Sequence, residues 1–245
     1  MKQHEAVIMT LEELGGFATL GQLYQEVPKI QACPWRTKTP FASIRRIVQT
    51  RREIYKIKPG LYGLCAKKPQ IEGRGILRET PANKSSRAII ESNHAYYQGL
   101  LLVVGKLKAY DTFAPQQDKR RMFLGTRIGE TRTLNEVPRF CYPHIVRRSQ
   151  TVDVIWFNDR KMPASFFEIE FSSDIQNSLL KFNDLQDFWA RMLIVADGAR
   201  RNEYATKVNY SAFAAIRKRV QFLDFISLVK QYELLMESKK VEVAL

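Results

Sequence analysis

Three carboxylates lie inside two short apolar segments of this chain. Asp153 is the third residue of segment 151–157, and Glu168 and Glu170 belong to segment 164–172. Both segments are rich in β-branched and aromatic residues, which predicts buried strands. An ionised carboxylate in such surroundings costs several kcal/mol unless something compensates it. Acids on two neighbouring strands therefore indicate a metal site.

The alternation of the second strand decides which side chains share a face. Glu168 and Glu170 are two residues apart and point to one face, whereas the residues between and beside them point to the other. The 14 residues between Asp153 and Glu168 fit a hairpin, so these two acids are expected to share one divalent cation. The alternative is that the acids lie on solvated faces or pair with some of the 39 Lys and Arg residues.

The net charge of the chain points to an anionic partner. Its 245 residues carry a formal charge of +14, and nucleic acid is the commonest partner of such a protein, although a merely basic surface is the alternative. Three widely spaced cysteines predict neither a disulfide framework nor a zinc site. No apolar run approaches the ~20 residues of a membrane span, so we expect a soluble, cytoplasmic protein.

The first 66 residues are expected to form a separate small domain. Apolar spacing predicts helices over 2–14 and 19–27, and Thr39-Pro40 predicts the start of a third helix. Segments 54–57 and 61–64, joined by a Pro-Gly turn, predict a hairpin. Arg and Gln side chains read base edges and hold phosphates. The DNA-binding residues expected on the third helix and the hairpin are Arg45, Arg46, Gln49, Arg51, Arg52, Lys56 and Lys58.

Several motifs of this domain carry a family resemblance. They are Leu14-Gly-Gly-Phe17, a Leu-Tyr helix, Lys38-Thr-Pro40 and Gly60-Leu-Tyr-Gly-Leu64. Together they resemble the HARE-type winged helix-turn-helix over residues 1–64, with an apparent insertion at 31–36. The resemblance implies DNA binding. Winged helices also serve as protein–protein modules, and that alternative stays open.

Residues 67–86 are polar, charged and rich in Pro, Gly and Ser, which predicts a linker. Residues 87–245 suit one α/β domain. Its predicted order is a helix (86–106), a strand (109–114), an irregular basic stretch, strands (151–157 and 165–172), a helix (174–189), a strand (192–196), a helix (202–211), a short strand (220–222) and a final helix (223–237). We expect a mixed central sheet flanked by helices.

The order of these elements and the acids they carry resemble the PD-(D/E)xK nuclease fold and a bacterial restriction-endonuclease-like family within it. The resemblance implies that Asp153 and Glu168 hold Mg²⁺, with Mn²⁺ as a substitute. Glu170 stands where most members have a lysine, so this chain is a Glu-x-Glu variant. A basic residue must then come from elsewhere, and Lys181 on the following helix is the nearest candidate. A solvated helix lysine is its alternative.

Further candidates accompany these residues. His94 and Gln98 are four positions apart on one helix face, which suits a place beside the scissile phosphate. Asp118, and less so Asp111, would add a metal-binding acid, although ordinary ion pairing also explains both. Ser172 and Asn177 would brace the helix after the second acid strand. The basic residues expected to hold phosphates in this part of the chain are Arg120, Arg121, Arg127, Arg147 and Arg148.

These patterns together predict a Mg²⁺-dependent, sequence-specific restriction endonuclease that cuts double-stranded DNA. Its expected partners are DNA, a second copy of the chain, and a DNA methyltransferase acting on the same site. Two other functions stay open. One is a DNA-binding regulator with an inactive nuclease-like domain. The other is a glycoside hydrolase with Glu168 and Glu170 as its acid pair, which would need the two carboxyl groups to flank a sugar cleft.

Overall fold

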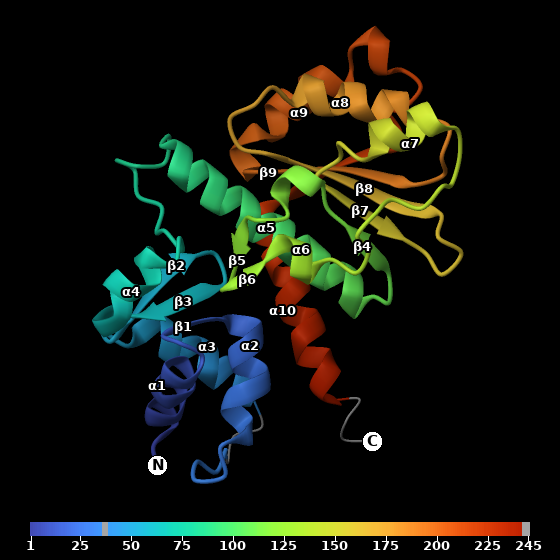
Figure 1. Ribbon diagram of the computed structural model, residues 1–245. Coiled ribbons are helices and arrows are strands. Elements are labelled where there is room, and N and C mark those ends of the chain that lie inside the picture. Colours follow the sequence, from blue (N-terminus) through green and yellow to red (C-terminus); the bar gives the residue numbers. More distant parts are fainter. Residues whose placement is uncertain (36–38, 242–245) are drawn as a thin grey trace. The chain divides into compact units, whose positions relative to one another are not determined.

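A computed structural model describes residues 1–35 and 39–241 of the chain (Figure 1). The chain divides into two compact units, and the final helix contributes to both. Residues 1–92 together with the chain from Val229 onward make the first unit, and Asn93–Leu228 make the second. Expected boundaries at 66 and 86 differ from this division, and the expected linker contains a short helix, α4 (Lys68–Gly73). Lys38, part of the third-helix motif, lies outside the described residues.

The first unit packs helices on a three-stranded antiparallel sheet of order β1-β3-β2. A glycine pair in the left-handed region, Gly15 (φ +87°) and Gly16 (φ +99°), separates the first helix from the first strand. Thr19 then caps the second helix, because its hydroxyl accepts from the Gln22 amide at 3.1 Å while Gln22 Oε1 accepts from the Thr19 amide at 2.8 Å. The elements are α1 (Gln3–Glu13), β1 (Phe17–Thr19), α2 (Leu20–Glu26), α3 (Pro40–Thr50), β2 (Ile54–Lys58) and β3 (Leu61–Leu64).

Helix α3 is strongly amphipathic. Ile44 and Val48 are buried in the core of the unit, whereas Arg46 and Gln49 are exposed. The third helix and the hairpin after it lie where the sequence predicts them, and the face of α3 expected to be polar is exposed.

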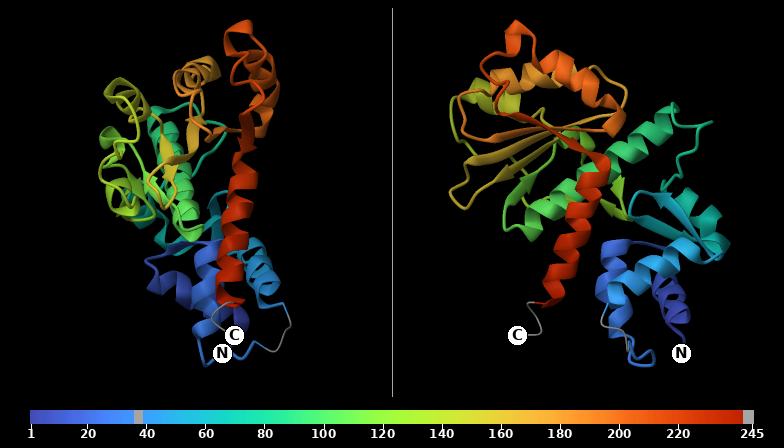
Figure 2. Two further views of the ribbon diagram at one scale, coloured as in Figure 1. Left: turned by 90° about the vertical axis from the view of Figure 1, so that its right-hand side faces the viewer. Right: turned by 180° about the vertical axis from the view of Figure 1, so that it is seen from behind.

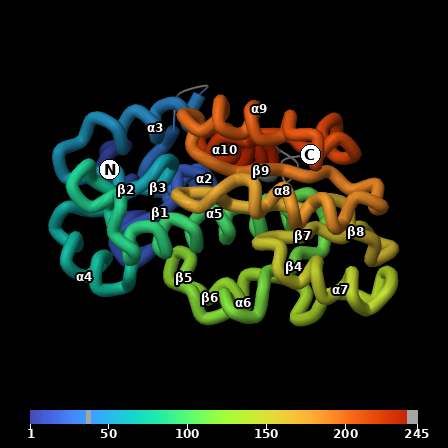
Figure 3. The backbone as a smooth tube through the Cα atoms, turned by 90° about the horizontal axis from the view of Figure 1, so that it is seen from above, coloured from blue at the N-terminus to red at the C-terminus, as the bar shows by residue number. Residues whose placement is uncertain are grey.

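The second unit is built on a mixed five-stranded sheet of order β10-β9-β8-β7-β4. Strands β8, β9 and β10 run parallel, and β7 and β4 are antiparallel to their neighbours. Helices α9, α8 and α7 lie side by side on one face of the sheet, and α5 crosses the other (Figures 1 and 3). The strands are β4 (Asp111–Phe113), β7 (Val154–Phe157), β8 (Pro163–Glu170), β9 (Arg191–Ala196) and β10 (Val220–Asp224). The helices are α5 (Arg87–Leu107), α6 (Ile128–Thr131), α7 (Pro143–Ser149), α8 (Ile175–Asp184) and α9 (Arg201–Val208).

Both faces of the central strands are buried, which explains their continuous apolar sequence. Phe166 and Ile194 pack beneath α8 with Leu179 and Phe182 of that helix. On the opposite face, Trp156 donates from its indole nitrogen to the Leu101 carbonyl of α5 at 3.0 Å. Helix α8 ends at Asp184, five residues before the predicted end, and leaves Trp189 97% exposed.

Helix α10 (Phe225–Val241) follows β10 without a loop (Figure 2). Its residues from Val229 onward belong to the first unit, where the Tyr232 and Thr19 hydroxyls are hydrogen-bonded at 2.9 Å. A side chain at Gly21 of α2 would collide with Tyr232 and Met236, so the glycine permits this close packing. Among the described residues no helix is long and apolar enough to cross a membrane.

Candidate active site

The three acids lie where β7 and β8 pair. Val154 faces Phe167 in the antiparallel register, so Asp153 precedes β7 at the end of the sheet that also carries Glu168 and Glu170. Glu168 and Glu170 are only 3% and 4% exposed, and both face α8. We call Asp153, Glu168 and Glu170 the acid cluster.

Asp153 is held by groups from its neighbouring strand and from α5. Its Oδ2 atom accepts a hydrogen bond from the Ile169 amide at 2.7 Å, and His94 Nε2 lies 3.3 Å from the same oxygen. Burial alone would raise the pKa of Asp153, but His94 and the Ile169 amide outweigh it and lower that pKa. Asp153 is therefore kept as a carboxylate of fixed orientation.

Glu168 is the most desolvated acid of the cluster. Burial, reinforced by the charge of Asp153, raises its pKa to about 8, although Lys181 and Ser178 oppose the shift. Lys181 Nζ donates to both carboxylate oxygens, at 2.8 and 3.0 Å, and also to the Thr151 carbonyl at 3.0 Å. The ammonium thus occupies a position surrounded by oxygens, as a bound cation would.

A single serine links the two glutamates. The Ser178 hydroxyl lies 3.0 Å from Glu168 Oε2 and is also hydrogen-bonded to Glu170, which Ser173 contacts as well. One hydroxyl carries one proton and cannot donate to both carboxylates at once. A proton on Glu168, or a cation beside it, satisfies this arrangement.

A second layer lies behind Asp153. Gln98 of α5 donates to the Asp153 carbonyl at 2.9 Å and to Asp118 Oδ2 at 3.0 Å. Asp118 is 1% exposed, and its Oδ1 lies 3.0 Å from Arg121 Nε. Arg121 also donates to His94 Nδ1 at 3.0 Å. These side chains join into one network around Asp153.

His94 experiences opposing influences. Burial lowers its pKa, but the charge and hydrogen bond of Asp153, with a contribution from Asp118, raise that pKa overall. The bond from Arg121 needs the lone pair of Nδ1, which is present only in the neutral ring. In the neutral form both ring nitrogens are satisfied, with Nε2–H directed at Asp153.

The residues present fit a hard divalent cation. Gln98 Oε1 is buried and has no hydrogen-bond partner among the described residues, which leaves one oxygen beside Asp153 and Asp118 available. In the described part of the chain no three His, Cys, Asp or Glu side chains converge as a ready-made metal site. Mg²⁺ does not need three, because it typically takes one or two carboxylates and keeps several waters. Asp153 and Glu168 would be those carboxylates.

Other predicted residues lie elsewhere in the fold. Asp111 pairs with Phe157 at the far end of β7 and forms an ion pair with Lys161, so it is remote from the acid cluster. Ser172 and Asn177 are exposed and do not contact the acids; Ser173 and Ser178 do. Arg148 pairs with Asp184 at 2.6 Å. The exposed basic residues of this unit that were expected to contact DNA are Arg120, Arg127 and Arg147.

The basic residues of the first unit fall into two groups. Lys58 is 5% exposed and donates to Ser92 Oγ at 3.1 Å, so its ammonium does not face solvent. Arg45 lies 3.1 Å from Glu233 and donates to the Tyr24 hydroxyl at 3.1 Å. Arg51 is half-buried. Arg46, Gln49, Arg52 and Lys56, the other expected DNA-binding residues of this unit, are exposed.

Two members of the site were not expected from the sequence. Ser178 bridges the glutamates, and the Thr151 carbonyl positions Lys181. A signal for the first was present, because Ser178 is three residues before Lys181 and therefore on the same helix face. The two glutamates are buried around one serine hydroxyl and do not flank an open cleft, which argues against the glycoside hydrolase alternative.

Residues 76–244 match the family described as the type II restriction enzyme NmeDI C-terminal domain. This span is more than half of the chain and contains the acid cluster. The chain belongs to this family. Neither the curated proteins nor the solved structures contain a match.

Proposed function

We propose that this protein is a Mg²⁺-dependent DNA endonuclease of the restriction type. The observation that carries the proposal is the juxtaposition of Asp153, Glu168 and Lys181 at one end of a mixed sheet. Membership in a restriction-enzyme family supports the substrate class, because the matched residues include all three. The order of one helix, three antiparallel strands, a helix and a parallel strand is compatible with a PD-(D/E)xK core.

The chemistry follows from the charges of the cluster. Bound Mg²⁺ would polarise the scissile phosphate and lower the pKa of an attacking water. Asp153 and Glu168 would hold the ion, with the Ile169 amide fixing the orientation of Asp153. Lys181 would supply positive charge for the phosphate in the transition state, in place of the lysine that Glu170 replaces. Glu170, hydrogen-bonded to Ser173 and Ser178, would accept a proton from the water.

DNA binding is proposed to involve both units. The proposal of a winged helix-turn-helix is supported by the order of helices and hairpin in the first unit, with the exposed side chains Arg46 and Gln49 on α3 and Lys56 on the hairpin. Arg120 and Arg147 of the second unit are exposed and would hold backbone phosphates. A homodimer would cut both strands, and a cognate methyltransferase would protect the host site.

Cleavage of defined DNA tests the proposal. Supercoiled plasmid and phage DNA, unmodified and methylated, are incubated with the protein and Mg²⁺, Mn²⁺ or EDTA. We expect discrete metal-dependent fragments that disappear with Glu168→Gln. Asp159→Asn is the matched control, because Asp159 is an exposed acid in the turn of the same hairpin. Fragments that persist at full rate in Glu168→Gln would disprove the assigned site.

A second candidate is a DNA-binding regulator whose nuclease-like unit does not cut. The observation that favours it is that Lys181 contacts both oxygens of Glu168 and so neutralises a carboxylate that the metal would need. This candidate predicts salt-sensitive DNA binding with no cleavage under any metal. The same plasmid assay, run beside a gel-shift assay, separates the two.

A further inference from the structure

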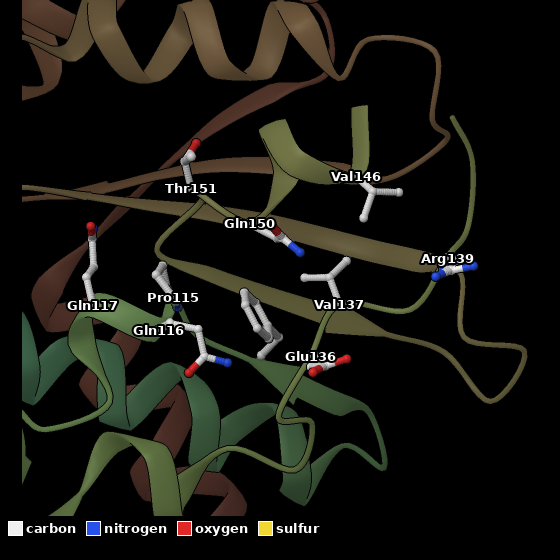
Figure 4. Close-up of a pocket in the computed structure, with 10 residues that line it drawn as sticks. Pro115, Gln116, Gln117, Glu136, Val137, Arg139, Val146, Gln150 and Thr151 are labelled. Atoms are coloured by element: carbon white, nitrogen blue, oxygen red, sulfur yellow. The ribbon is translucent and has the colours of Figure 1, made fainter. Parts of the chain in front are cut away.

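A pocket of about 610 Å³ opens on the second unit, between the chain that follows β4 and the chain that follows α7 (Figure 4). Its walls come from the end of β4, the loop at 136–139, and α7 with the two residues after it. We call it the amide pocket, because three of its ten lining residues are glutamines. The lining residues are Phe113, Pro115, Gln116, Gln117, Glu136, Val137, Arg139, Val146, Gln150 and Thr151.

The amide pocket combines an apolar base with hydrogen-bonding groups. Phe113, Val137 and Val146 are buried and form its apolar part. Gln150 extends toward Val137 and Val146, and Arg139 lies at the far side (Figure 4). The side-chain amides of Gln117 and Gln150 have no hydrogen-bond partner in the described part of the chain, and both residues are exposed. Each offers one donor group and one acceptor to an occupant.

The wall that carries Gln116 is preformed. Gln116 donates to the Asn135 carbonyl at 2.6 Å and accepts from Arg132 at 3.3 Å. Arg132 also donates to the Ala114 carbonyl at 2.6 Å and lies 5.5 Å from the centre of the Phe113 ring. These bonds hold the pocket open without a ligand.

The amide pocket adjoins the proposed reaction centre through two residues. Thr151 lines the pocket, and its carbonyl accepts from Lys181, which contacts Glu168. On the other wall, Gln117 immediately precedes Asp118 of the network behind Asp153. An occupant of the pocket would therefore lie next to a phosphate held at the acid cluster. The exposed Arg139 and Arg147 provide positive charge nearby for the backbone.

We propose that the amide pocket receives a single nucleobase extruded from the duplex beside the scissile phosphate, and that Gln150 hydrogen-bonds to its pairing edge. The proposal rests on the endonuclease function proposed above and specifies how the substrate is read. An extruded base needs an apolar surface for its ring and amide groups for its Watson–Crick edge, and the pocket provides both. Its volume lies within the range of pockets that enclose a ligand of nucleoside size.

Base extrusion has a measurable signature in binding. A mismatched or abasic position is easier to open than a paired one, so it favours a protein that must open it. Fluorescently labelled duplexes that differ only in one central mismatch are titrated with the full-length protein in Ca²⁺, which replaces Mg²⁺. We expect the mismatched duplex to bind about tenfold more tightly than the paired one. Equal affinities at every mismatch position would overturn the proposal.

Variants connect this signature to the pocket. Gln150→Leu removes the hydrogen-bonding amide, and we expect it to weaken binding of the mismatched duplex and to relax the base preference next to the cut, read by sequencing the fragment ends. Gln221→Leu is the control, because Gln221 is an exposed glutamine of β10 outside the pocket. An unchanged mismatch preference in Gln150→Leu would refute the assignment.

The possible failures are distinguishable. Absence of cleavage with a preserved mismatch preference would remove the endonuclease proposal and leave the pocket as a base-binding site. Cleavage without mismatch preference would keep the endonuclease and remove the extruded base. Tight binding of free nucleosides without DNA would identify a small-molecule pocket and also overturn the proposal.

Discussion

Glu168→Gln is expected to make the protein more stable while abolishing the proposed cleavage activity. In the folded protein the pKa of Glu168 is raised to about 8, from 4.5 in the unfolded chain, chiefly by burial. Between these pH values the folded state retains a proton that the unfolded chain has released. The free energy of unfolding therefore falls as the pH rises from 4.5 to about 8.

The size of this effect follows from the pKa difference. Each pKa unit corresponds to 1.36 kcal/mol, which gives an upper bound of about 5 kcal/mol for the whole interval. The interaction with Asp153, whose own pKa is lowered, means that the two acids titrate together. We expect about 2 kcal/mol to remain as the advantage of Glu168→Gln above pH 8, vanishing below pH 4.5. Glutamine keeps the shape and an acceptor for Ser178 and Lys181 but has no charge to bury.

Urea denaturation in EDTA at pH 5, 7 and 8.5 measures this difference, with Asp159→Asn as the control. We expect the midpoints of wild type and Glu168→Gln to diverge as the pH rises, and the control to follow wild type. Added Mg²⁺ should stabilise wild type and not Glu168→Gln, since the ion would bind the ionised carboxylate. Parallel midpoints across the pH range would refute the reasoning from burial.

Three further substitutions test other parts of the structure. Lys181→Met should lower the single-turnover cleavage rate by about 100-fold, because it removes the positive charge from the cluster, while DNA binding in Ca²⁺ persists; a rate within threefold of wild type would contradict the role of Lys181. Lys58→Met should raise stability by about 1–2 kcal/mol below pH 7, because burial lowers the pKa of Lys58 to about 7 and the charged form is penalised. That gain should shrink toward pH 10.5, where wild-type Lys58 is neutral in both the folded and the unfolded state. Urea denaturation at pH 6 and 9 measures the gain, and an equal difference between variant and wild type at both pH values would contradict the prediction. Gly21→Val should destabilise the first unit by about 1–3 kcal/mol, since its Cβ would lie 2.8 Å from Met236 and Tyr232; limited proteolysis of α10 that matches wild type would disprove this.

The sequence predicted the strands and the faces of the acids because both follow from local alternation. Asp153, Glu168 and Glu170 lie at one end of the sheet, as the hairpin spacing predicts, and the period of two places Glu168 and Glu170 on one face. Lys181 contacts Glu168, and its distance along α8 places it on the face that covers the strand. Local periodicity carries this information without knowledge of the tertiary fold.

Lys58 shows where the same reasoning stops. Strict alternation would place Lys58 on the exposed face with Lys56, but the pairing of β2 with β3 shifts register between these two residues. The irregularity turns Lys58 inward, where it contacts Ser92. A one-residue shift of this kind has no counterpart in the apolar pattern of the strand.

Contacts between segments far apart in the sequence could not be predicted either. Arg45 lies in the helix expected to read DNA, and its partner Glu233 is 188 residues further along the chain. Nothing near Arg45 indicates that an acid will lie beside it. Ser178 could have been inferred from Lys181, but its bridging of two glutamates depends on side-chain positions that only the fold defines.

The divided membership of α10 has a consequence for the order in which the protein becomes functional during synthesis. The first 92 residues leave the ribosome early, yet the helix that packs on Gly21 and pairs with Arg45 begins its contribution at Val229. The surface of the first unit that is proposed to read DNA is therefore completed only after the acid cluster has been translated. A nascent chain that stalls before residue 229 would carry neither Tyr232 nor Glu233 to complete that unit.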